Sequence, residues 1–188
     1  MAGSKPRRFR RSSRSRKRVV NFLRRERVHE LLDFLLMLGI IYFLFTGAMT
    51  LLLRTDSYWM GVTSQSMRHT DDNTWRRYYT DRGIDSRQLP LQGGFERGDL
   101  VIVQGVASFS EVHIGDVVIL DQGQGVIPLV HRVVQIWEEG GSFYFTTKGD
   151  ANASSLPTEI ANRPEQVIGK VILTVPKLGY ISLFFQGE

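Results

Sequence analysis

Hydrophobic residues form one long run near the N-terminus and only short runs after it. The long run, residues 34–53, reads FLLMLGIIYFLFTGAMTLLL and contains no charged residue. On a helix its apolar side chains would cover every side, unlike the single apolar stripe of a helix on a soluble core. At about 1.5 Å per residue the run spans roughly 30 Å, the thickness of a bilayer's hydrocarbon core. The pattern predicts a transmembrane helix over residues 31–54; the alternative is a helix buried in a soluble protein.

The transmembrane run is longer than the apolar part of a cleaved signal peptide, which has about 7–15 residues. No small-x-small cleavage site follows closely, because the next residues are Arg54, Thr55 and Asp56. We therefore expect an uncleaved signal anchor.

Positive charge is concentrated before this anchor. Residues 1–30 contain twelve Lys and Arg and two Glu, a net charge of +10, whereas the whole chain carries +5, so the remainder carries −5. The positive-inside rule places residues 1–30 in the cytoplasm and residues 55–188 outside the membrane. The basic tail is low in complexity and is expected to be partly disordered, up to Arg24. It either only fixes the topology, which we favour, or also binds anionic headgroups or RNA.

After residue 55 the pattern changes to short runs rich in β-branched and aromatic residues, mostly separated by Gly, Asp, Pro or Asn. The predicted strands are residues 100–103, 117–120, 130–134, 143–147 and 167–174. Strands this short and frequent indicate an all-β domain, a barrel or a folded sheet. Residues 68–96 lack a clear period and predict a long polar loop with a helical turn around residues 75–79. The fold class is therefore mainly β, with one N-terminal transmembrane helix and an extracytoplasmic all-β domain.

Composition excludes several kinds of chemistry. The chain has no cysteine, so it can form neither a disulfide nor a thiolate nucleophile. Its four histidines lack a metal-binding spacing such as H-x-x-x-H, and we expect no metal and no cofactor. The domain after the anchor is mildly acidic, so we expect no nucleic-acid partner for it.

Three segments carry the groups that a serine protease needs: a hydroxyl nucleophile, a base, and donors for the developing oxyanion. They are TSQSM at 63–67, LVHRVV at 129–134 and TKGDAN at 147–152. On a strand, residues two apart point the same way, so the hydroxyls of Ser64 and Ser66 would face one cleft.

Five short motifs follow the anchor in a fixed order. They are SQSM at 64–67, RGDL at 97–100, GDV at 115–117, HRV at 131–133 and KGDAN at 148–152. In this order they resemble the type I signal peptidases of the archaeal and endoplasmic-reticulum type, over about residues 34–175. Each motif alone is weak, and their order behind an anchor is what makes the resemblance specific.

The resemblance implies a role for each matched residue. Ser66 would be the nucleophile, and Ser64 together with the backbone N–H of Ser66 would hold the oxyanion. His131 would be the general base, where the bacterial branch of the family has a lysine, and an imidazole ionises near working pH. Asp150 would support His131, and Arg132 would order the site or pair with a carboxylate.

Two positions depart from the family. His69 stands where the family usually has a proline, two residues after the methionine of S-x-S-M. Leu156 stands where a second aspartate is usual, six residues after Asp150, and the nearest carboxylate is Glu159. The third catalytic group is therefore Asp150, the matched position, or Glu159.

Other residues near these motifs have competing interpretations. His69 is three residues from Ser66, but on a strand it would face the opposite side, which makes it the weaker candidate for the base. Lys148 is a weaker candidate as well. Asp99 and Asp116 are expected to cap turns that lead into strands.

The sequence thus predicts a membrane-bound serine endopeptidase, a signal peptidase I, that cleaves signal peptides from exported preproteins. Its partners would be preprotein signal peptides, the lipid bilayer and, as a candidate, the secretion translocon. It would cross the cell membrane once, with the catalytic domain outside, or in the lumen of a eukaryote. The alternatives are a related protease with a dedicated clientele, a non-catalytic membrane-anchored peptide-binding or scaffold domain, and a nucleic-acid or ribosome-associated protein that acts through its tail.

Overall fold

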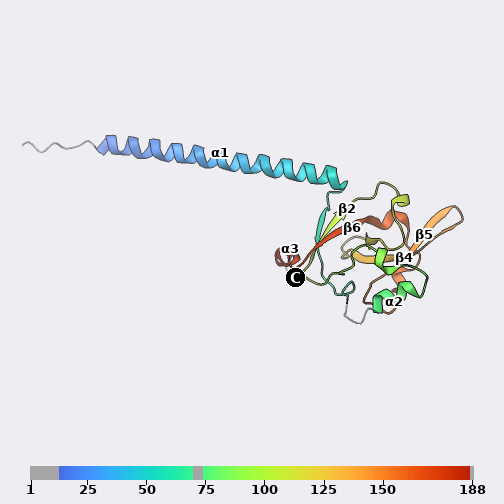
Figure 1. The fold of residues 1–188 in the computed structure, drawn as a ribbon. Helices are drawn as coiled ribbons and strands as arrows, with labels where there is room; N and C mark the ends of the chain where they lie inside the picture. The colour runs from blue at the N-terminus through green and yellow to red at the C-terminus, as the bar shows by residue number, and fades with distance from the viewer. Residues whose placement is uncertain (1–12, 70–73, 187–188) are drawn as a thin grey trace, which may run out of the picture. The chain divides into compact units, whose positions relative to one another are not determined.

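The computed structural model describes residues 13–69 and 74–186. Contacts divide the chain into two units, one up to Gly47 and one from Ala48, and each is described by itself. The first unit is formed by most of α1, the helix Ser13–Leu53 (Figure 1). Among the described residues, one helical segment, Arg27–Leu53, is long and apolar enough to cross a membrane.

Helix α1 begins earlier than the sequence predicted. Residues 1–12 of the basic tail lie outside the described part of the chain, and the expected disorder of the tail there is not addressed by the structure. Residues 13–23, which were also expected to be disordered, belong to α1. Most large apolar side chains between residues 31 and 52 are exposed, which a helix surrounded by lipid requires.

The second unit contains a six-stranded antiparallel sheet with the strand order β1-β2-β6-β3-β4-β5 (Figure 1). A long apolar helix followed by a β domain confirms the predicted fold class. All five predicted strands are present, and β1 is an additional edge strand that the sequence did not predict. The strands are β1 (Trp59–Gly61), β2 (Leu100–Gln104), β3 (Val117–Leu120), β4 (Leu129–Glu139), β5 (Ser142–Lys148) and β6 (Val167–Val175).

Strand β3 explains why a short run of four apolar residues without alternation forms a strand. Successive side chains of a strand point to opposite faces. Val117 and Ile119 pack in a core cluster with residues of β2 and β6. Val118 and Leu120 pack in a second cluster with Phe145 of β5. Because β3 is covered on both faces, both sets of side chains are apolar.

The R-G-D and G-D motifs form the turns that lead into β2 and β3. Gly98 and Gly115 have φ angles of 89° and 99°, a region that glycine adopts without steric strain. The carboxylate of Asp99 accepts a hydrogen bond from the backbone N–H of Glu96 at 2.9 Å. Asp116 likewise accepts from the backbone of the residue three positions before it, also at 2.9 Å. Both aspartates therefore close turns, as predicted.

The predicted loop over residues 68–96 is partly structured. Where the sequence indicated a helical turn, the structure has α2 (Thr74–Thr80), whose Trp75 and Tyr79 are buried. The other short helices are η1 (Ser86–Gln88), η2 (Phe109–Glu111), η3 (Pro157–Glu159), η4 (Pro164–Gln166) and α3 (Gly179–Gln186).

Candidate active site

Ser64 and Ser66 lie between β1 and the first bridge of the following loop. The backbone N–H of Arg68 donates to the carbonyl of Gln65 at 3.0 Å, which makes this segment a turn rather than the predicted strand. The two hydroxyl oxygens nevertheless meet at 3.1 Å. Ser66 is half-buried and Ser64 is exposed. Met67 turns inward into the core, which anchors the turn.

His131 lies on β4, opposite Val118 of β3, and is buried. Its Nδ1 contacts a carboxylate oxygen of Glu159. Among the described residues, its Nε2 is buried and has no hydrogen-bond partner. The ring therefore has one nitrogen fixed by a carboxylate and one nitrogen that is free to accept a proton.

Glu159 is held at the end of η3 by groups that all donate to it. Its carboxylate accepts hydrogen bonds from Thr147 Oγ1 at 2.9 Å and from the backbone N–H of Leu156 at 2.8 Å. Burial alone would raise the pKa of Glu159, but the hydrogen bonds from His131 and from the Leu156 backbone outweigh it, and the pKa is lowered. An ionised Glu159 can only accept, so His131 carries its proton on Nδ1 and presents a free lone pair on Nε2.

Gly149 brings the serine turn and His131 together. A methyl group on residue 149 would lie 2.8 Å from both the carbonyl oxygen of Ser66 and Nε2 of His131. The same Ser66 carbonyl accepts a hydrogen bond from the backbone N–H of Ala151 at 2.8 Å. The nucleophile candidate and the base candidate are therefore neighbours across a position where only a hydrogen atom fits.

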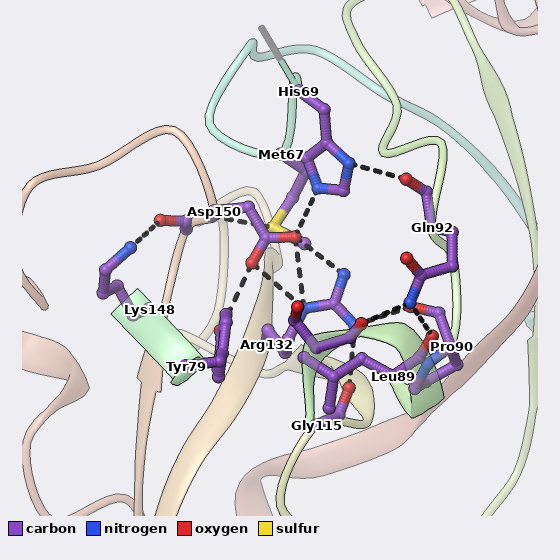
Figure 2. Close-up of polar contacts among 12 residues, drawn as sticks. Met67, His69, Tyr79, Leu89, Pro90, Gln92, Gly115, Arg132, Lys148 and Asp150 are labelled. Carbon is purple, nitrogen blue, oxygen red and sulfur yellow. Dashed lines mark hydrogen bonds and ion pairs between the residues drawn. The ribbon is translucent and has the colours of Figure 1, made fainter. Parts of the chain in front are cut away.

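Asp150 faces a different set of groups. Its carboxylate accepts from the Arg132 guanidinium at 2.7 to 3.1 Å, from Tyr79 at 3.3 Å, and contacts His69 Nε2 at 2.8 Å (Figure 2). Arg132 is itself fully buried, and its Nη1 also donates to two backbone carbonyls, at 2.7 and 2.8 Å. Of the two candidates for the third group, Glu159 contacts His131, whereas Asp150 pairs with Arg132.

Lys148, the weaker candidate for the base, is also buried. Its Nζ donates to the carbonyl of Gly149 at 2.9 Å and lies 4.6 Å from the centre of the Tyr78 ring. Burial lowers the pKa of Lys148. A structural role in fixing the Gly149 segment accounts for these contacts.

A small apolar cavity opens beside Ser64. It has a volume of about 240 Å³ and is bounded on one side by the segment that leads from β1 to Ser64. The other side is formed by the start of β4. Its walls include Gly61, Val62, Phe95, Val101, Ile127 and Leu129. Among the described residues, no cluster of three or more His, Asp or Glu side chains could hold a metal ion.

The contacts of two site residues differ from the sequence interpretation. As a candidate for the third catalytic group, Glu159 ranked below Asp150, because only Asp150 matched a family motif. Glu159 was the carboxylate nearest to Leu156, where the family usually has a second aspartate. His69 was set aside because the serine segment was treated as a strand. In the turn that forms instead, His69 faces Asp150.

A buried histidine held by a carboxylate, beside the turn whose Ser66 hydroxyl meets that of Ser64, makes this a candidate Ser–His hydrolase centre. Comparison with curated proteins shows distant homology to the catalytic subunits of the endoplasmic-reticulum type I signal peptidases, a serine peptidase family. This confirms the resemblance seen in the motifs. No family model matches the chain.

Three relatives illustrate the similarity. They are the signal peptidase complex catalytic subunits SEC11 of Verticillium alfalfae, Chaetomium globosum and Metarhizium robertsii, which are 32%, 30% and 32% identical to the chain over 99 residues. Each match covers 50% of this chain and 57% of the relative, so the chain spans little more than half the length of the curated relatives it matches.

Proposed function

We propose that this protein is a membrane-bound serine endopeptidase that removes signal peptides from exported preproteins. The observation that carries the proposal is the arrangement of His131, whose Nδ1 is held by Glu159 while its buried Nε2 is unpartnered among the described residues and lies beside the Ser66 turn. The homology to signal peptidase catalytic subunits supports the substrate class.

In the proposed reaction, Ser66 Oγ attacks the scissile carbonyl while His131 Nε2 accepts the hydroxyl proton. Glu159 stabilises the imidazolium that forms and keeps the ring in the productive orientation. The negative charge on the tetrahedral oxygen is bound by the Ser64 hydroxyl and the backbone N–H of Ser66. His131 then returns the proton to the leaving amine, and a water molecule hydrolyses the acyl-enzyme by the same steps.

The cavity beside Ser64 supports a preference for small side chains. Its volume of about 240 Å³ is less than the 300–1,000 Å³ typical of drug-sized ligand sites. An extended substrate segment that runs along the residues leading from β1 to Ser64 would place alternate side chains on the same face. Apolar walls then favour small aliphatic residues before the cleaved bond.

The direct test is cleavage of a model preprotein by the full chain solubilised in detergent. We expect a single cut at the end of the signal sequence, located by sequencing the new N-terminus. Cleavage of only one class of preprotein would favour the dedicated protease. Binding of the preprotein without any cut would favour the non-catalytic peptide-binding domain.

The basic tail and the apolar helix predict the orientation of the chain in the membrane. We expect the N-terminus in the cytoplasm and the β domain outside, because residues 1–30 carry a net charge of +10 and the remainder a net charge of −5. If the β domain faces the cell exterior, protease added to intact cells should digest an epitope tag at the C-terminus and spare one at the N-terminus. If it faces a lumen, protease added to sealed microsomes should spare the C-terminal tag and digest the N-terminal one. The reverse pattern would contradict this topology.

Gly149→Ala is expected to lower kcat by about 10²-fold or more, because the added methyl group would push the base away from the Ser66 turn. Gly93→Ala is the matched control, since a methyl group there meets no atom within 4 Å. Steady-state kinetics of both variants on the same preprotein measures the difference. Equal activity of the two variants would show that the close approach at Gly149 is not needed.

A further inference from the structure

His69 makes contacts through both nitrogens of its ring. Nε2 lies 2.8 Å from the carboxylate of Asp150, and Nδ1 lies 3.0 Å from the backbone carbonyl oxygen of Gln92 (Figure 2). The ring stacks on Trp75 of α2, with 3.9 Å between ring centres and 14° between planes. Gly94 leaves space for it, because a methyl group there would lie 2.7 Å from the imidazole.

These two partners determine the charge of His69. A backbone carbonyl can only accept a hydrogen bond, so Nδ1 must carry a proton. The Arg132 guanidinium donates to both oxygens of the Asp150 carboxylate, an ion pair that requires the carboxylate to be ionised. An ionised Asp150 also only accepts, so Nε2 must carry a proton as well. A ring that donates from both nitrogens is an imidazolium.

Charged groups from several elements surround His69. Asp150 is the anion that faces the ring, and it also pairs with the Arg132 guanidinium. Two further cations lie near the cluster: Arg76, 5.0 Å from the Trp75 ring centre, and the buried Lys148. Tyr79 is neutral, because burial raises the pKa of its hydroxyl. Asp150 thus bonds two cationic side chains, and the hydrogen bond from His69 Nε2 is one of those that fix the cluster.

His69 connects this cluster to the nucleophile. It follows Ser66 by three residues, in the turn whose Met67 sulfur accepts a hydrogen bond from the Asp150 backbone at 3.5 Å. Asp150 also binds Arg132, the residue next to His131 on β4. Asp150 therefore joins the turn that carries Ser66 to the strand that carries His131, and His69 is the side chain that attaches the turn.

We propose that His69, as an imidazolium, is a positioning residue that fixes the Ser66 turn to Asp150 and so aligns Ser66 with His131. This inference rests on the proposed function. The two histidines then have different tasks: His131 accepts the proton of Ser66 at its free Nε2, and His69 donates from both ring nitrogens to hold the turn.

The test compares His69→Gln with His113→Gln, an exposed histidine outside the site. Glutamine retains hydrogen-bonding capacity but cannot carry the charge. We expect His69→Gln to lower kcat about 10- to 100-fold with little change in KM, because the turn is misaligned while substrate binding is kept. His113→Gln should keep the wild-type kcat and KM. A His69→Gln enzyme with the wild-type kcat, or one whose loss lies in KM alone, would overturn the proposal.

A measurement on the wild-type protein does not depend on how the variant folds. In ¹⁵N NMR of histidine-labelled protein at neutral pH, the His69 signal, identified by its absence in His69→Gln, should show both ring nitrogens protonated. A neutral tautomer would overturn the proposal even if the protein is active. A charged ring in a protein that cleaves no preprotein would instead overturn the proposed function, and the positioning role with it.

Discussion

Replacement of Ser66 by alanine is expected to reduce cleavage to background, whereas Ser64→Ala should retain measurable activity. Ser66 Oγ is the atom that would form the acyl-enzyme, and no second hydroxyl can replace it without moving the turn. Ser64 Oγ, 3.1 Å away, would be one of at least two donors to the oxyanion. Loss of one such donor typically lowers kcat by about 10²–10³-fold.

The two serine variants lie two positions apart with their hydroxyls in contact, although Ser66 is half-buried and Ser64 is exposed. Circular dichroism and membrane extraction should show both variants folded and inserted. A serine-directed acylating probe should label the wild type and Ser64→Ala, and should fail to label Ser66→Ala. Equal and modest losses in both variants would indicate substrate contact or packing instead. Full activity of Ser66→Ala would make the anchored peptide-binding domain the better account.

The architecture could be predicted because it depends on patterns that are local in sequence. An uncharged apolar run of twenty residues has few alternatives to a helix that crosses a membrane. Each G-D turn requires a glycine at positive φ and an aspartate that closes the turn. Both residues can be read directly from the sequence. Strand β1, of three residues, carried too short a pattern to be recognised.

The sequence did not predict which side chains of the site contact one another, because these contacts depend on how segments distant in the sequence meet. Asp150 follows the end of β5 by two residues and Glu159 by eleven, and spacing alone does not show which carboxylate returns to His131. The 3-10 helix Pro157–Glu159 directs Glu159 to the ring, while Asp150 turns to Arg132. The contacts of His69 could not be predicted for the same reason, because the face of its side chain was deduced from a strand where the chain forms a turn.

Glu159→Gln is expected to lower kcat by on the order of 10⁴-fold while the protein stays folded. In the wild type the carboxylate accepts from His131, Thr147 and the Leu156 backbone N–H. The amide oxygen of the substituted side chain must face the Leu156 N–H, since an amide NH₂ there would oppose another donor. The amide NH₂ then donates to Nδ1 of His131 and to the Thr147 hydroxyl, which can accept. This moves the ring proton to Nε2, and the ring can no longer act as a base.

Asp150→Asn is the matched substitution; it should lower stability and, through the weakened contact with His69, also lower kcat, by less than Glu159→Gln does. It leaves the buried guanidinium of Arg132 without its carboxylate, a loss that typically costs about 3–5 kcal/mol of unfolding free energy. Thermal unfolding and kcat measured on both variants separate the roles: Glu159→Gln should keep the melting temperature and lose kcat, and Asp150→Asn should lose melting temperature first. If the Asp150→Asn protein is as stable as the wild type but loses more kcat than Glu159→Gln, Asp150 rather than Glu159 is the third group that supports His131.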